Sequence, residues 1–243
     1  MNKIANEIKN RLSLRKPQWE SLEILSDIAD VLTLKKNTNL DEAKAKIKEL
    51  GSKFEEVKKF SDFERDFPNV CFALATGVGK TRLMGAFIAY LHIEKKINNF
   101  FVLAPNLTIY NKLIEDLGNP SNPKYVFKGI SEFAVSQPQI ITGDNYNKHQ
   151  NIVTNLTNTL FKRVRINIFN ISKINSDVDK KTGLPRIKRL SEYLGESYFD
   201  YLKNLPDLVL LMDESHHYRA SASAKALNEL NPVLGLELTA TPQ

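Results

Sequence analysis

The first 34 positions carry apolar residues at the three-and-four spacing of one buried helical face. Pro17 precedes this face and suits a first helical turn, because the backbone amides of that turn have no partner within the helix. We therefore predict that residues 1–34 are helical and bury a face formed by Leu22, Leu25, Ile28, Ala29 and Leu32.

Residues 35–66 follow a different pattern, because charged side chains dominate them. They include nine Lys or Arg and eight Asp or Glu residues, and Gly51 interrupts them. Glycine in such a pattern marks a break, so we predict two short helices separated at Gly51. A segment rich in both charges is typical of a solvated surface. We therefore interpret residues 1–68 as a helical N-terminal segment that ends in a charged, solvated spacer.

From residue 68 onward, short apolar runs alternate with amphipathic stretches. One helix is predicted over residues 80–95, and a second carries Ile109, Leu113, Ile114 and Leu117. Apolar strands that alternate with helices are typical of a parallel sheet covered on both faces. We therefore predict an α/β domain over residues 69–243, with a mostly parallel sheet flanked by helices. Its strands are expected at residues 70–74, 100–104, 139–142, 166–170, 208–212 and 234–238.

The composition excludes several classes of protein. Of the 243 residues 42% are hydrophobic and the net charge is +6, which excludes an intrinsically disordered chain. The single cysteine, Cys71, excludes a disulfide scaffold and suits a reducing compartment. No apolar run approaches the ~18 residues needed to span a bilayer, and the N-terminus has no apolar signal core. We expect a cytoplasmic protein with no membrane partner.

A glycine-rich segment, Ala75-Thr-Gly-Val-Gly-Lys-Thr81, lies between a predicted strand and a predicted helix. Its glycines allow backbone amides to face phosphate oxygens at a helix N-terminus, which favours anions. Lys80 would reach the β- and γ-phosphates, and the Thr81 hydroxyl would bind Mg²⁺. The strict pattern has glycine where this chain has Leu74, and a turn that only lets a helix pack on a strand is the alternative. The expected nucleotide-binding residues are Thr76, Gly77, Val78, Gly79, Lys80, Thr81 and Arg82.

Two carboxylates, Asp213 and Glu214, follow the apolar run 208–212, at the strand end where parallel sheets bind ligands. We expect Asp213 to hold Mg²⁺, and Glu214 to be catalytic beside Lys80 by orienting or deprotonating a water molecule. An acidic pair that caps the next helix is the alternative. The adjacent His216 and His217 lack further ligands for zinc. His216 is instead expected to couple by hydrogen bonds to the last motif, Leu238-Thr-Ala-Thr-Pro242, which contains Thr239 and Thr241.

Together, the segments Ala-Thr-Gly-Val-Gly-Lys-Thr, Asp-Glu-Ser-His and Leu-Thr-Ala-Thr-Pro resemble motifs I, II and III of superfamily 2 helicases and translocases. Leu14-Arg-Lys-Pro-Gln18 resembles the adenine-binding Q motif of that family, although an exposed polar residue in a first helical turn is the alternative for Gln18. Residues 102–108 resemble motif Ia. The resemblance implies a RecA-like fold and ATP and Mg²⁺ as cofactors. It further implies contacts to DNA from Pro105, Asn106, Thr108, Thr142, Gly143, Asn170 and Lys173, for which a plain exit from a strand into a loop is the alternative.

Within this superfamily, the motifs most resemble the restriction subunit of type III restriction–modification enzymes. That resemblance implies an ATP-driven motor on double-stranded DNA, a modification (methyltransferase) subunit as partner, and a nuclease domain outside this chain. Type I restriction motors and stand-alone defence helicases share the motifs and stay open, as does an RNA helicase. A nucleotide-gated binding module without hydrolysis is a further alternative, against which Glu214 weighs, because such a module needs no water-activating carboxylate.

The chain stops one residue after Pro242, whereas the resemblance implies a second RecA-like domain with arginines that complete the ATP site. An arginine finger contributes about 10³- to 10⁵-fold to turnover. We therefore expect these 243 residues to be a truncated motor that binds nucleotide weakly and hydrolyses it poorly.

Residues 162–189 contain nine basic and two acidic side chains, a net charge of +7 that exceeds the +6 of the whole chain. Part of this segment, 174–187, is predicted to be a loop that follows a strand end on the nucleic-acid side. It is either a patch that contacts phosphates or a solvated loop without function.

Overall fold

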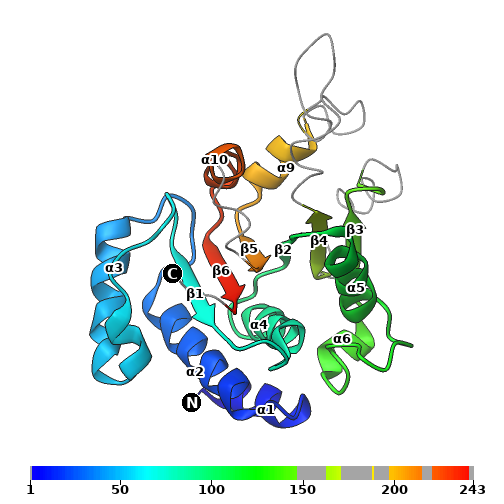
Figure 1. The fold of residues 1–243 in the computed structure, drawn as a ribbon, viewed down its shortest axis with the longest axis horizontal. Helices are drawn as coiled ribbons and strands as arrows, with labels where there is room; N and C mark the ends of the chain where they lie inside the picture. Colours follow the sequence, from blue (N-terminus) through cyan, green and yellow to red (C-terminus); the bar gives the residue numbers. More distant parts are fainter. Residues whose placement is uncertain (1, 147–162, 171–187, 189–196, 215–220, 241–243) are drawn as a thin grey trace.

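A computed structural model describes residues 2–146, 163–170, 188, 197–214 and 221–240. In this described part, one six-stranded sheet has the order β1-β6-β5-β2-β4-β3, and all five of its strand pairs are parallel (Figure 1). All six predicted strands are confirmed, each with ends within one residue of those expected. They are β1 (Asn69–Ala73), β2 (Asn99–Ala104), β3 (Gln139–Thr142), β4 (Arg165–Asn170), β5 (Leu208–Asp213) and β6 (Leu234–Thr239).

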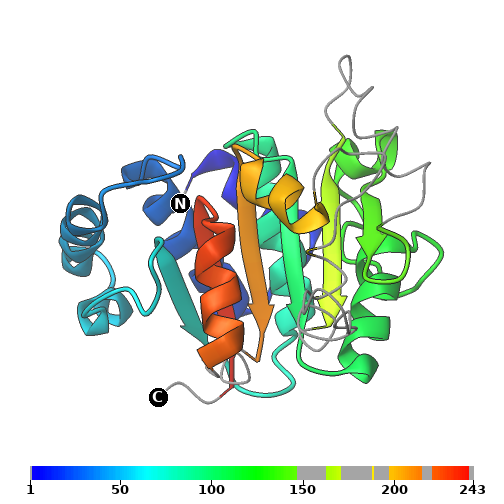
Figure 2. The ribbon, with the colours of Figure 1, turned by 90° about the horizontal axis from the view of Figure 1, so that it is seen from above.

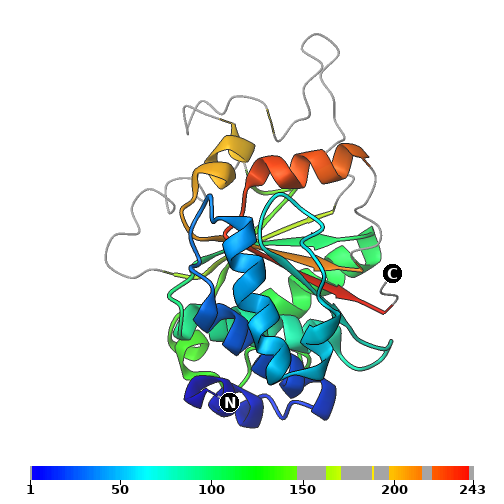
Figure 3. The same cartoon turned by 90° about the vertical axis from the view of Figure 1, so that its left-hand side faces the viewer.

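Helices cover both faces of this sheet, as the apolar strands predict. On one face lie α4 (Lys80–Ile93) and α5 (Leu107–Gly118), which share a core with strand residues such as Val102 and Leu236. On the other face lie α9 (Tyr198–Asn204) and α10 (Ser221–Leu230), packed on Phe101 and Leu210 (Figure 3). Strands β2, β5 and β6 are buried along their whole length, which is the α/β arrangement expected from the sequence.

The N-terminal segment is helical, as predicted, but it forms two helices. α1 (Lys3–Arg11) and α2 (Lys16–Val31) are separated at Ser13, whose φ of 48° lies in the left-handed region. Pro17 lies in the first turn of α2, as expected. Both helices pack on α4, and this second layer explains why residues 83–91 of α4 are all buried.

The prediction for residues 35–66 is wrong in two respects. First, α3 (Leu40–Glu49) is followed by two short 3-10 helices, η1 (Leu50–Ser52) and η2 (Glu55–Lys59), and Gly51 is a buried residue inside η1. Second, the segment is not wholly solvated. Arg65 is buried and binds Glu237 of β6, 172 residues away, with 2.9 Å between Nε and Oε1. A count of charges in the sequence carries no signal of a partner so distant.

Because the strands are parallel, their carboxyl ends lie along one edge of the sheet, towards which the arrowheads point in Figure 2. The loops that leave β1, β2, β5 and β6 at this edge contain the motifs found in the sequence. A short helix, α6 (Ser131–Val135), precedes β3. Among the described residues, no helix has the length and apolar character needed to span a membrane.

Candidate nucleotide-binding site

The glycine-rich segment forms the loop from β1 to the start of α4. Gly77 and Gly79 have φ values of 80° and 95°, in the left-handed region that glycine adopts without strain. A side chain on Gly79 would also place its Cβ 2.8 Å from Nε2 of Gln18. At the position where the strict pattern has glycine, Leu74 is buried, and its amide extends the β1–β6 pairing by donating to Thr239 O at 2.8 Å.

Lys80 and Glu214, the two expected catalytic residues, form an ion pair across this loop. Both are largely shielded, with side chains 12% and 23% exposed. Glu214 has a φ of 52°, and its amide donates to Leu238 O at 2.8 Å. Its second oxygen, Oε2, accepts from the amide of Ala240 at 3.4 Å. Glu214 therefore connects the phosphate loop with the segment that carries the last motif.

The residues expected to hold Mg²⁺ are sequence neighbours of this ion pair: Asp213 directly precedes Glu214, and Thr81 directly follows Lys80. Asp213 ends β5 and is buried, whereas Thr81 follows Lys80 in the first turn of α4. Burial raises the pKa of the Asp213 carboxyl above its ordinary value; the positive charge of Lys80 opposes the rise, and Glu214 adds to it. A carboxylate and a hydroxyl are oxygen donors of the kind that Mg²⁺ prefers, so these residues fit the metal.

Gln18 faces the phosphate loop but is not the exposed side chain that the alternative described. It is 2% exposed. Its Oε1 accepts from the amide of Arg15 at 2.8 Å, and its Nε2 donates to the carbonyl of Gly79 at 2.9 Å. Gln18 thus fastens the start of α2 to the phosphate loop. The same two atoms are the ones that would pair with adenine, so the adenine-binding role stays a prediction.

A pocket of about 610 Å³ opens beside the loop, and its lining joins α2, α4 and α5. It includes one acidic residue, Asp116, and a group of basic residues that suits a polyphosphate: Arg15, Lys80, Arg82, Lys112 and Lys124. Of the residues expected to bind nucleotide, Thr76 is exposed in the loop and does not line this pocket. Arg82 does line it, and donates to Leu12 O at 3.1 Å.

Sequence reasoning missed Arg15, Lys112 and Lys124 as pocket residues. Lys112 lies on α5, where its Nζ donates to Oγ1 of Thr81 at 2.8 Å. No known motif spacing marks Lys112 or Lys124, because both reach the pocket only through the packing of α5 and the loop after it against α4. Arg15 lies within the segment that resembles the Q motif, which was the one available signal.

The residues expected to contact DNA lie at the same edge of the sheet, in two settings. Pro105, Asn106 and Thr108 surround the start of α5, where the Asn106 side chain accepts from the amide of Ile109 at 2.9 Å and caps the helix. Thr142, Gly143 and Asn170 are buried, and the Thr142 hydroxyl accepts from the amide of Asp144 at 3.3 Å. Three expected site residues lie outside the described residues: Lys173, His216 and Thr241. Most of the basic segment 162–189 does so too.

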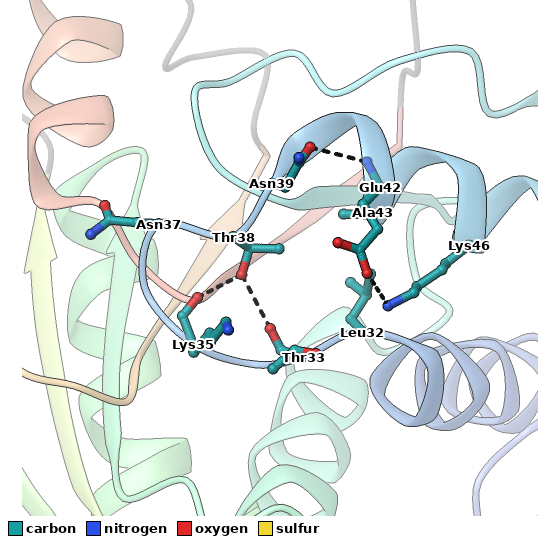
Figure 4. A pocket seen from close by; sticks show the side chains of 9 residues that line it. All are labelled: Leu32, Thr33, Lys35, Asn37, Thr38, Asn39, Glu42, Ala43 and Lys46. Atoms are coloured by element: carbon teal, nitrogen blue, oxygen red, sulfur yellow. Dashed lines mark hydrogen bonds and ion pairs between the residues drawn. The ribbon is translucent and has the colours of Figure 1, made fainter.

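A second hollow, of about 230 Å³, lies between the end of α2 and the start of α3 (Figure 4). Several of its polar side chains bind one another or nearby backbone. Thr38 donates to Lys35 O at 2.7 Å, and the Asn39 side chain caps α3 by accepting from Asp41 and Glu42 amides. None of its lining residues was expected to bind nucleotide or DNA, so the pocket beside Lys80 is the candidate nucleotide site.

Comparisons with known proteins agree with the resemblance found in the motifs. The family model described as "Type III restriction enzyme, res subunit" matches residues 11–243. A curated relative from Haemophilus influenzae, the probable type III restriction-modification enzyme HindVIP Res subunit, is 25% identical over 175 residues. The match covers 72% of this chain but only 29% of that relative, so the chain spans less than a third of its length.

Two solved structures are similar at 15% sequence identity and a TM-score of 0.42. One is the SWI2/SNF2 ATPase core of Sulfolobus solfataricus in complex with double-stranded DNA, with 87% of this chain and 34% of that chain covered. The other is a nuclease-deletion mutant of the Type ISP restriction-modification enzyme LlaGI with a DNA substrate mimic, with 85% and 18% covered.

Proposed function

Since the chain belongs to the family of type III restriction enzyme Res subunits, we propose that it is the ATP-binding and ATP-hydrolysing motor domain of a DNA translocase. The whole protein would be the restriction subunit of a type III restriction endonuclease. The observation that carries this proposal is the cluster at the sheet edge: a phosphate loop, the Lys80–Glu214 pair and a pocket with five basic side chains.

The geometry suggests how these residues act on ATP. Lys80 leaves Glu214 and binds the β- and γ-phosphates, together with the amides that Gly77 and Gly79 free for anions. Thr81 and Asp213 would hold Mg²⁺, which when bound neutralises charge on the phosphates. Released from Lys80, the Glu214 carboxylate can orient or deprotonate a water molecule.

Glu214 would also transmit the state of the nucleotide. Its Oε2 accepts from the amide of Ala240, between Thr239 and Thr241, so a shift of Glu214 away from Lys80 acts on this segment. Asn106 and Thr108, the expected DNA contacts, lie at the start of α5, the helix that also contributes Lys112 to the pocket. In this proposal, ATP binding and DNA contact share one edge of the sheet.

The proposal extends to partners and to the activity of this chain alone. By the family resemblance, we propose that the motor moves on double-stranded DNA and that its partner is a modification subunit. The protein would act in the cytoplasm. The completing arginines would come from a second RecA-like domain. The 243 residues alone are therefore expected to hydrolyse ATP poorly, since such an arginine contributes about 10³- to 10⁵-fold to turnover.

The test is steady-state ATP hydrolysis by the full-length protein with duplex DNA, single-stranded DNA or RNA, and Lys80→Ala serves as the blank. We expect duplex DNA to stimulate hydrolysis and Lys80→Ala to remove the stimulation. Stimulation by RNA alone would contradict a DNA motor and favour an RNA helicase. Hydrolysis that survives in Lys80→Ala would contradict the assignment of the site.

A further inference from the structure

Lys112 of α5 binds a group that the proposed function assigns to the metal. Its Nζ donates to Oγ1 of Thr81 at 2.8 Å. The same ammonium lies 3.4 Å from Oδ2 of Asp116, one helical turn further along α5. The Asp116 carboxylate is 6% exposed and the Lys112 side chain 46%, so the carboxylate is fixed by its surroundings while the lysine has room to move.

The hydrogen bond sets Lys112 on the side of the site where Mg²⁺ would bind. Thr81, one expected metal ligand, directly follows Lys80, whose ammonium pairs with Glu214, the neighbour in sequence of the other expected ligand, Asp213. Lys112, Thr81 and Asp116 also line the same pocket. Lys112 therefore provides positive charge on the metal side of the site.

We propose that Lys112 is a tethered cation that holds the Thr81 hydroxyl until Mg²⁺ with its nucleotide displaces it towards Asp116. This inference rests on the proposed function. An ammonium group and a divalent cation on one hydroxyl oxygen repel each other, so both cannot bind Thr81 together. Asp116 receives the displaced ammonium, because its shielded carboxylate already lies within reach.

The displacement has a measurable consequence for metal-dependent binding. In the wild type, Mg²⁺ must replace the hydrogen bond between Lys112 and Thr81, which reduces the gain in nucleotide affinity that the metal brings. Lys112→Met removes this competitor and keeps the length of the side chain. Although the Lys112 ammonium is charged, its side chain is 46% exposed, so we use the range of an ordinary hydrogen bond, which corresponds to about a 2- to 10-fold change in an equilibrium constant.

The experiment measures the dissociation constant of mant-ADP for the full-length protein in excess Mg²⁺ and in EDTA, and takes the ratio of the two. We expect the Mg²⁺ enhancement of Lys112→Met to exceed that of the wild type by about 2- to 10-fold. Lys124→Met is the matched control, because it removes the same charge from the same pocket and leaves the Lys112–Thr81 bond intact. Loss of Lys124 from the pocket should weaken mant-ADP binding about equally in Mg²⁺ and in EDTA, so that its Mg²⁺ enhancement equals that of the wild type.

Three results would overturn the inference. An enhancement in Lys112→Met equal to or below that of the wild type would show that Lys112 does not compete with the metal. An equal rise in Lys124→Met would assign the effect to net charge. Absence of mant-ADP binding by the wild type under both conditions would instead contradict the proposed function, and this inference with it. Melting temperatures of all three proteins establish that each is folded.

Discussion

Glu214→Gln should abolish ATP hydrolysis while it strengthens ATP binding. Glutamine keeps the shape of the side chain but cannot accept a proton from water, and loss of a general base typically costs about 10²- to 10⁴-fold in rate. In the structure, Glu214 pairs with Lys80, so the phosphates must compete with a carboxylate for the lysine. A neutral amide weakens that competition, and bound ATP should then be retained.

Single-turnover hydrolysis and equilibrium binding of ATP by the full-length protein separate these two effects. Glu132→Gln on α6 is the control, because it makes the same chemical change at an exposed position. Near-normal hydrolysis by Glu214→Gln would contradict a water-activating role. Loss of ATP binding would show instead that Glu214 supports the folded site.

The second large effect is expected on stability, at the buried ion pair of Arg65 and Glu237. Their side chains are 4% and 1% exposed, and Asn69 donates a further hydrogen bond to Glu237 at 3.3 Å. Arg65→Met leaves a buried carboxylate without its cation, a change that typically costs about 3–5 kcal/mol. We expect urea denaturation to show a loss of this size in the free energy of unfolding.

Two variants make this prediction specific. Lys46→Met breaks an exposed pair with Glu42 on α3 and should change stability by less than about 1 kcal/mol. Glu237→Leu combined with Arg65→Met removes both charges and should recover much of the loss, because no ion then remains buried alone. An Arg65→Met protein as stable as Lys46→Met would show that the pair does not hold residues 60–66 to the sheet.

The strands β2, β5 and β6 were predictable because each is a short, mostly apolar run, and burial on both faces requires this composition. The phosphate loop was predictable because its glycines, lysine and threonine are adjacent in sequence. By contrast, the break between α1 and α2 depends on Ser13, which adopts a left-handed backbone conformation although it is not a glycine. The sequence therefore carries no signal of this break. Likewise, Arg65 is buried as the ion-pair partner of Glu237. The sequence alone does not predict this pair, because it depends on the position of β6 beside β1 in the sheet.

Some residues of the candidate site were likewise predictable from the sequence, and others were not. Lys80, Asp213 and Glu214 follow from motifs at strand ends, since parallel strands bring those ends to one edge. Lys112 has no such signal, because a lysine on an amphipathic helix is most often a solvated side chain. Only the packing of α5 beside α4 brings it to Thr81.

The central claim is that the pocket beside Lys80 binds the phosphates of a nucleotide, and calorimetric titration of the full-length protein with Mg²⁺ and ATPγS tests it most directly. Wild type should bind, and Lys80→Ala should bind about 10- to 100-fold more weakly, as expected for loss of a charge-assisted hydrogen bond. Lys95→Ala, at an exposed pair with Asp30, should bind as the wild type does. Equal affinities of wild type and Lys80→Ala would contradict the claim.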